Sequence, residues 1–128
     1  MSTPYFDFKQ FRVWHDQCAH RVGTDGVLLG AWAQGGKKIL DIGTGSGLIA
    51  LMMAQRFPDA QIDAVEQDET SAEQAKKNFS KSPFQSRIKL INQRIQDFKS
   101  TNNYDCIVCN PPYFTETVLG NDGRRMNA

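Results

Sequence analysis

The chain has 128 residues, of which 40% are hydrophobic, so it is long and apolar enough for one domain with a buried core. Its formal net charge of +1 excludes a strongly basic nucleic-acid-binding protein, although local patches matter more for such binding than totals. No apolar run approaches a membrane span, and the start at Met1 lacks the basic and apolar stretches of an export signal.

The first 36 residues predict a hairpin followed by a helix. Apolar side chains between Phe6 and Trp14 are typical of an irregular hairpin. Thr24 then has the side chain of a helix cap, and the apolar residues that follow predict a helix to Trp32, before two glycines. We expect 1–36, this hairpin and helix, to cover one side of a sheet.

From residue 37 onward, strand and helix patterns alternate, which predicts an α/β fold with a parallel sheet. The expected strands are 38–42, 61–66, 87–91 and 104–109, with helices at 48–57 and 70–79 and a turn at 95–98. The run 70–73 has the spacing of a capping box and opens the second helix. Gln67 or Asp68 could contact an adenine edge, but Asp68 is better explained as the start of that helix.

The fourth expected strand, 104–109, is too apolar for a comfortable sheet edge, and a polar tail follows at 121–125. We therefore expect a fragment whose sheet is truncated after this strand. The missing C-terminal half or another chain would cover the exposed edge.

Cys106 and Cys109 lie three apart in this strand, so their side chains point to opposite faces and cannot share a metal ion. We interpret them as small core residues and expect no metal site. The odd count of three cysteines favours a protein of the reducing cytoplasm.

The segment from Asp41 to Gly47 lies at the end of the first strand and opens a helix, which is the position of a nucleotide-binding turn. Its glycines, among them Gly43 and Gly45, let backbone amides approach a ligand closely. Leu48 stands where a dinucleotide fingerprint has its third glycine. The form found here, with an acidic residue two before the first glycine, favours S-adenosylmethionine.

Two further carboxylates follow strands and support this cofactor. Glu66 comes at the end of the second strand, where ribose hydroxyls lie in such sheets. Asp97 follows the third strand and can accept from the adenine amino group while the Phe98 ring packs alongside. Asp97 taken alone is equally well explained as a solvated turn residue.

The run from Asn110 to Tyr113 reads Asn-Pro-Pro-Tyr and follows the fourth strand. Its prolines stiffen the corner and remove two donors, so the corner offers acceptors to a planar amino group. We expect the Asn110 side chain and the Pro111 carbonyl to accept the two N–H bonds while Tyr113 stacks on the target. Methyl transfer would then be in line and need no strong base.

With these motifs, the chain resembles class I S-adenosylmethionine-dependent methyltransferases of the Asn-Pro-Pro-Tyr group, over about residues 6–113. It is most similar to the bacterial tRNA (adenine-N6)-methyltransferases that modify adenine 37 of a valine tRNA. The segments that carry the narrower resemblance are Phe8-Lys9-Gln10-Phe11, 23–32 and Ser82-Pro83-Phe84. The resemblance implies a Rossmann-like fold, of which 37–128 would be the N-terminal half.

The resemblance also implies roles for single residues and a tRNA partner. Thr24 and Asp25 would border the cofactor. Asp41 and Gly43 would hold its methionine part, Glu66 its ribose and Asp97 its adenine. Asn110 and Tyr113 would carry the target base.

Three alternatives stay open. Protein glutamine N5-methyltransferases, which act on release factors, use the same corner, but they carry a helical recognition domain before the glycine turn. Guanine-N2 methylation of ribosomal RNA is the second alternative. The third is a cofactor-binding fragment without activity of its own.

Contacts to RNA are indicated by two basic groups. Lys9, Arg12, His15, His20 and Arg21 make a mildly basic N-terminal face, which is equally well explained as solvated charge. Arg124 and Arg125 follow the Asn-Pro-Pro-Tyr corner. If these two arginines contact phosphate, replacing both flattens the salt dependence of RNA binding.

Overall fold

The computed structural model describes residues 4–18, 23–100 and 103–110. Its strands are β1 (Tyr5–Asp7), β2 (Arg12–Trp14), β3 (Lys38–Ile42), β4 (Gln61–Val65), β5 (Ile88–Ile91) and β6 (Cys106–Cys109). Its helices are α1 (Thr24–Trp32), α2 (Leu48–Arg56) and α3 (Glu69–Ser80), with the short 3-10 helices η1 (Gln85–Arg87) and η2 (Ile95–Asp97).

The main sheet has the strand order β5-β4-β3-β6, and each neighbouring pair is parallel. This confirms the predicted α/β fold, because helices α2 and α3 make the crossovers that parallel neighbours require. The register places Ile91, Val65, Ile42 and Cys109 side by side at the carboxyl ends of the strands. The order reverses between β3 and β6, which is where open α/β sheets bind ligands.

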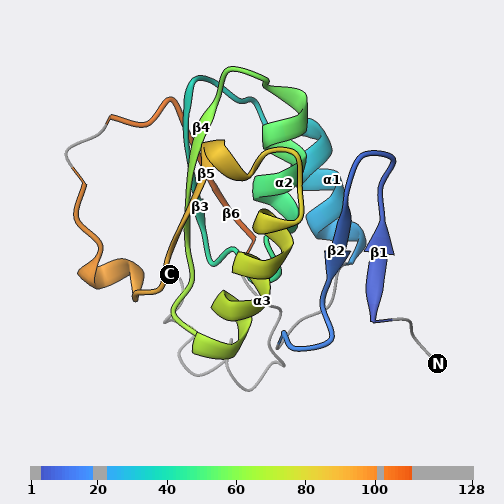
Figure 1. Ribbon diagram of the computed structural model, residues 1–128. Helices are drawn as coiled ribbons and strands as arrows, with labels where there is room; N and C mark the ends of the chain where they lie inside the picture. The colour runs from blue at the N-terminus through green and yellow to red at the C-terminus, as the bar shows by residue number, and fades with distance from the viewer. Residues whose placement is uncertain (1–3, 19–22, 101–102, 111–128) are drawn as a thin grey trace, which may run out of the picture.

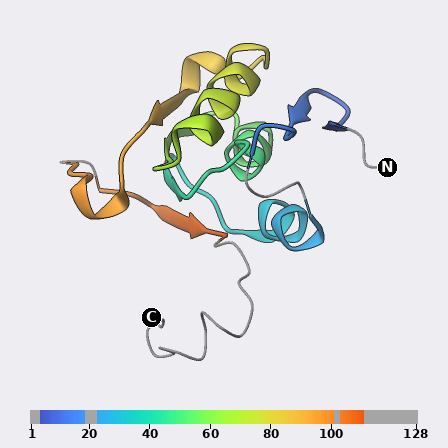
Figure 2. The ribbon, with the colours of Figure 1, turned by 90° about the horizontal axis from the view of Figure 1, so that it is seen from below.

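Figures 1 and 2 show α1, α2 and α3 on one side of the sheet. The segment that carries η2 lies on the other side, so that face has no long helix over it within the described residues. Ile107 of β6 is 60% exposed there. Within the described part, β6 pairs with β3 alone and forms a sheet edge.

Helix α2 lies at the centre of the core. Every residue from Leu48 to Ala54 is buried, because the sheet covers one side of the helix and α1 the other. The approach of α1 is close: a Cβ added at Gly30 would lie 2.5 Å from the Met52 sulfur. Phe11 and Val13 of the N-terminal segment join the same core.

The β1–β2 hairpin packs on α3 and not on the sheet, so the expectation that 1–36 covers a sheet face is wrong for the hairpin. Gln74 and Asn78 of α3 bond to the hairpin and to the residues after it. The helical layer already occupies this face of the sheet, so the hairpin forms a further layer outside it (Figure 2).

Two expected helix starts are corrected. Helix α3 begins after Asp68, whose carboxylate accepts the Ser71 N–H at 2.9 Å, so Asp68 is the cap and the capping box at 70–73 is wrong. Helix α1 begins at Thr24, and the capping position before it is Gly23, which provides no side-chain hydrogen bond. Thr24 is therefore the first helical residue and not the cap.

Arg87 joins the end of α2 to β5. Its guanidinium donates to the carbonyls of Ala54, Phe57 and Ala60 at 2.9, 3.2 and 2.9 Å. We expect Arg87→Lys to lower the free energy of unfolding by about 2–3 kcal/mol, because a single ammonium cannot replace the planar fork. Urea denaturation measures this. Lys89→Gln, at an exposed position of β5, is the control, and equal stability of both variants would contradict the prediction.

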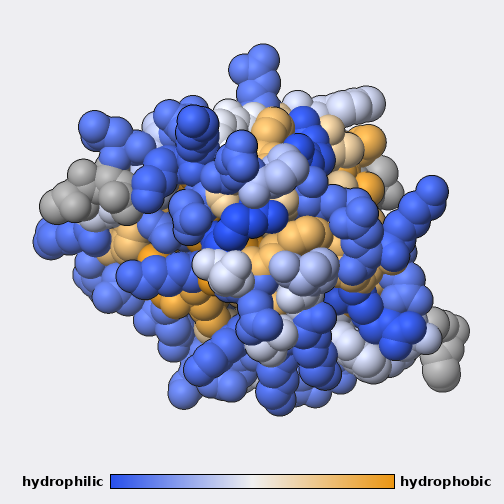
Figure 3. Space-filling view, turned by 45° about the horizontal axis from the view of Figure 1, so that its top comes forward, coloured by the Kyte–Doolittle hydropathy of each residue, from blue (hydrophilic) through white to orange (hydrophobic). Residues whose placement is uncertain are grey.

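Polar side chains cover most of the face shown in Figure 3, with apolar atoms visible between them. Among the described residues, no helix has both the length and the apolar character needed to cross a membrane.

Candidate active site

The strand register brings four sequence-distant residues into one row. Asn92, Glu66, Gly43 and Asn110 directly follow the aligned ends of β5, β4, β3 and β6. Parallel strands end at the same edge of a sheet, so the two predicted groups of cofactor and catalytic residues meet there.

The glycine turn at 43–47 is open on one side and packed on the other. Gly43, Gly45 and Gly47 have φ values of 70°, 57° and 91°, which residues with a Cβ rarely adopt. A Cβ at Gly43 or Gly45 would meet no atom within 4 Å, whereas one at Gly47 would lie 2.4 Å from the Phe79 ring. The turn thus rests on α3 and leaves its first two glycines accessible, as their predicted role requires.

Glu66 is fixed against this turn. One carboxylate oxygen accepts the Gly45 N–H at 2.8 Å, and the other accepts the Asp68 N–H at 2.9 Å. Each carboxylate oxygen can accept a further bond, so the half-buried group retains capacity for two hydroxyls.

Asp41 lies beneath the turn and is 1% exposed. Its Oδ2 accepts the Thr44 hydroxyl at 2.7 Å, while its Oδ1 has no hydrogen-bond partner within the described residues. Burial raises the pKa of Asp41 to about 7, more than the bond from Thr44 lowers it. A buried carboxylate with a free oxygen suits a cationic ligand group.

Asn110 is held beside the start of α1. A Cβ added at Gly26 would lie 3.1 Å from Asn110 Nδ2 and 2.9 Å from Leu48 Cδ2, so a larger residue would require one of these side chains to move. Asp25, the neighbouring residue, is exposed in the first turn of α1. The N-terminal segment therefore reaches the row of strand ends at Gly26, and the role of Asp25 beside the cofactor stays a prediction.

Asp97 and Phe98 lie at the end of η2, on the side of the sheet away from the long helices (Figure 1). The exposed Asp97 carboxylate pairs with Arg94 at 3.1 Å, and Phe98 is half-buried. Within the described residues, no hydrogen bond joins Asp97 to the glycine turn, so its assignment to adenine stays a prediction.

Residues 22–122 match the model of the methyltransferase small domain family. The chain belongs to this family. A relative from Bacteroides thetaiotaomicron, named tRNA1(Val) (adenine(37)-N6)-methyltransferase, is 55% identical over the whole chain, which covers 55% of that protein. The chain thus spans about half the length of the curated relatives it matches.

Solved structures agree on the fold of this methyltransferase small domain. TYW2 of P. horikoshii in complex with MeSAdo is similar, with a TM-score of 0.67 and 19% identity over 80% of this chain and 40% of that one. PKMT2 from Rickettsia typhi in complex with AdoHcy is 34% identical, with a TM-score of 0.52, over 57% of this chain and 14% of that one.

Several predicted residues lie outside the described part of the methyltransferase domain. These are Pro111, Tyr113, His20, Arg21, Arg124 and Arg125, together with the side chain of Thr24. Within the described part, the expected basic N-terminal face is reduced to the exposed Lys9. His15 is 6% exposed and Arg12 is paired with Asp7 at 2.6 Å, so neither presents a free surface charge.

The cysteines of β6 do point to opposite faces. Cys106 packs against the core, whereas Cys109 is exposed, so its interpretation as a core residue is wrong. It lies on the face of the sheet that no long helix among the described residues covers. Across the described ranges, no group of three or more potential ligands could hold a metal ion.

Sequence reasoning missed two asparagines near the site. Asn92 donates to the carbonyls of Glu66 and Gln67 at 2.8 and 3.4 Å and so supports the end of β4. Its position directly after the third predicted strand is the signal that could have found it. Asn78 lies inside α3 and carries no such signal.

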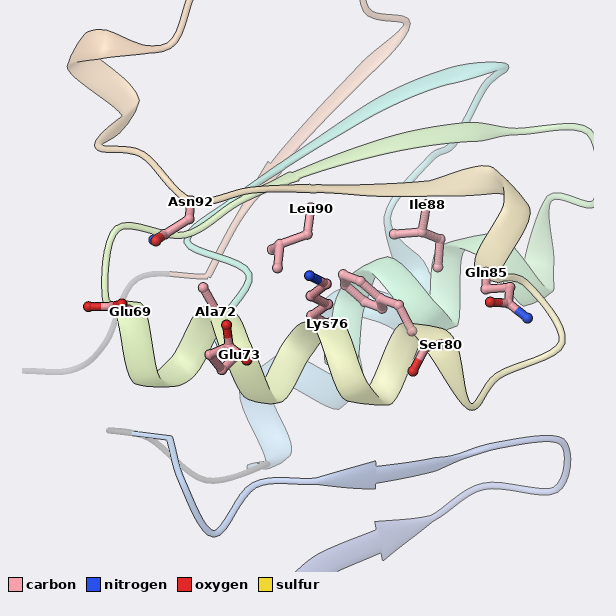
Figure 4. A pocket seen from close by; sticks show the side chains of 10 residues that line it. Glu69, Ala72, Glu73, Lys76, Ser80, Gln85, Ile88, Leu90 and Asn92 are labelled. Atoms are coloured by element: carbon pink, nitrogen blue, oxygen red, sulfur yellow. The ribbon is translucent and has the colours of Figure 1, made fainter.

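A pocket of about 400 Å³ lies between α3 and β5 (Figure 4). Leu90 and Ile88 point into it from the strand, with Lys76 and Glu73 on the helix. None of the predicted site residues lines it. The candidate site of this methyltransferase domain is instead the open surface at the strand ends.

The raised pKa of Asp41 predicts a pH-dependent stability. The folded state keeps a proton that the unfolded carboxyl, with a pKa of 3.8, releases, so stability falls as the pH rises from about 4 to about 7. The slope from this group reaches at most about 1.4 kcal/mol per pH unit. We expect Asp41→Asn to remove that contribution, as measured by urea denaturation between pH 5 and pH 8. Identical slopes for the variant and the natural protein would contradict it.

Proposed function

We propose that the chain carries the catalytic half of an S-adenosylmethionine-dependent tRNA (adenine-N6)-methyltransferase, whose target is adenine 37 of a valine tRNA. The observation that carries this is the row in which Asn110 stands beside the glycine turn, in a chain 55% identical to a protein named for that reaction. The activity is a proposal because the chain spans about half of that relative.

The residues at the strand ends fit the cofactor. The free oxygen of buried Asp41 suits the ammonium of the methionine part, and the open backbone at Gly43 and Gly45 suits a closely bound ligand. Glu66 would accept from the ribose hydroxyls, and Asp97 with Phe98 would take the adenine. Thr24 and Asp25 would border the cofactor from α1. When bound, the cofactor supplies an electrophilic methyl group.

Asn110 would orient the target amino group. Its side-chain oxygen and the Pro111 carbonyl would accept the two N–H bonds, which turns the nitrogen lone pair toward the methyl group. Tyr113 would stack on the base, an interaction of about 1–3 kcal/mol. The nitrogen becomes acidic only after methylation, so positioning and electrostatics carry the reaction. An anticodon-loop adenine is unpaired, which lowers the cost of turning it into the site.

We further propose that residues absent from this chain, or another chain, cover the edge of β6. Three apolar side chains are exposed there and on α1: Ile107 at 60%, Trp32 at 76% and Leu28 at 41%. Trp32→Lys and Ile107→Lys should reduce binding of an apolar fluorescent dye by this chain.

The three cysteines are free, which agrees with a cytoplasmic setting.

Incubation with labelled S-adenosylmethionine and separate pools of tRNA, ribosomal RNA and release factors tests the function. We expect label in tRNA, at the N6 position of an adenine. Label on release factor alone would favour the glutamine N5-methyltransferase, and label in ribosomal RNA the guanine-N2 enzyme. Cofactor binding without transfer to any pool would favour a cofactor-binding fragment.

A further inference from the structure

Asn78 of α3 joins the N-terminal hairpin to the glycine turn. The residue is 1% exposed, and both donors of its amide are used. Its Nδ2 donates to the Trp14 carbonyl at 2.8 Å and to the Ser46 carbonyl at 2.7 Å, while its Oδ1 accepts the Trp14 N–H at 3.0 Å. One buried side chain therefore fixes the backbone of β2 and of the turn at once.

The bond to Ser46 holds the glycine turn from below. Glu66 holds Gly45 at 2.8 Å, and the Phe79 ring lies against Gly47. Ser46 is 6% exposed, so Asn78 bonds to the turn from its buried side.

Gln74, one helical turn before Asn78, anchors the same segment without reaching the turn. Its Oε1 accepts the Gln17 N–H at 3.0 Å, and its Nε2 donates to Asp16 at 2.8 Å. It is 6% exposed, so it matches Asn78 in chemistry and burial. The two amides differ in that Asn78 alone bonds to the glycine turn.

We propose that Asn78 is a positioning residue through which the N-terminal hairpin sets the geometry of the cofactor turn. The inference rests on the proposed binding of S-adenosylmethionine at that turn. The β1–β2 hairpin, α3 and the glycine turn are then coupled through Asn78. A cofactor that orders the turn therefore also orders the hairpin backbone at Trp14.

The first test compares Asn78→Asp with Gln74→Glu by calorimetric titration with S-adenosylhomocysteine. Each change removes amide donors from a buried site, so both should lower the melting temperature. We expect Asn78→Asp to weaken binding at least about tenfold, because the buried Ser46 carbonyl of the glycine turn loses its donor. We expect Gln74→Glu to weaken binding less than about twofold, because Gln74 donates to Asp16 and not to the turn. Equal weakening in both variants would overturn the proposal.

The second test needs no variant and so does not depend on how Asn78→Asp folds. Amide hydrogen exchange of the natural protein is measured with and without saturating S-adenosylhomocysteine. We expect the Trp14 amide, held by Asn78, to be slowed more than the Gln17 amide, held by Gln74. Equal slowing of the two would refute the coupling. If the natural protein does not bind the ligand, the proposed function fails instead.

Discussion

Asn110→Ala is expected to lower kcat for tRNA methylation about 100- to 1000-fold and to leave the affinity for S-adenosylhomocysteine within about twofold. The range is that found when one positioned polar group at a reaction centre is removed. Asn110 would touch the target amino group and not the cofactor, so the substitution should lower kcat and leave the affinity for the cofactor unchanged. Methylation of valine tRNA transcript and calorimetric titration measure the two quantities.

Gly26→Ala provides a graded form of the same experiment. The new methyl group would lie 3.1 Å from Asn110 Nδ2 and 2.9 Å from Leu48 Cδ2, so one of these side chains must move. We expect a loss of about tenfold in kcat, since small displacements of positioned groups are costly. Asn103→Ala, at an exposed position before β6, is the control.

An Asn110→Ala protein with natural kcat would exclude the proposed role of this corner.

Glu66→Gln is expected to weaken binding of S-adenosylhomocysteine about 100-fold. The carboxylate would accept two ribose hydroxyls, and each hydrogen bond to a charged group contributes roughly 1.5–3 kcal/mol. The amide also places a donor against the N–H of Gly45 or Asp68, since both oxygens of Glu66 now accept from the backbone. Part of the effect thus reaches the cofactor through the glycine turn.

Glu69→Gln is the matched control. Glu69 is exposed in the first turn of α3, and its replacement by glutamine removes the same charge as Glu66→Gln. Its affinity should stay within about twofold of the natural protein. Thermal denaturation of both variants separates loss of fold from loss of binding. A folded Glu66→Gln protein with unchanged affinity would rule out the ribose assignment.

Much of the fold was predictable because the signals are local. The apolar runs of β3, β4, β5 and β6 and the break after α2 mark strands and helices wherever the chain folds, and the structure has them within about two residues. The capping box expected at 70–73 was wrong for a local reason as well. Two capping patterns overlap there, and the geometry of Asp68 decided between them.

The layers were not predictable in the same way. Phe11 and Val13 were expected to lie over a sheet face, but whether a hairpin packs on strands or on helices depends on which surface other elements leave free. Cys109 was misplaced for a similar reason. Alternation along β6 shows that Cys106 and Cys109 face opposite ways. It does not show that, among the described residues, long helices cover only one of those faces.

The sequence alone determined which polar residues and glycines stand at the ends of the strands. Asp41, the glycine turn, Glu66 and Asn110 each follow or end a recognisable strand, and parallel strands bring their carboxyl ends to one edge whatever the remaining packing is. Only the tertiary structure decided how these groups are held. The close fit of Gly26 against Asn110, the orphan oxygen of Asp41 and the bonds of Asn78 join residues far apart in the chain. Such contacts depend on burial and distance, which no local pattern encodes.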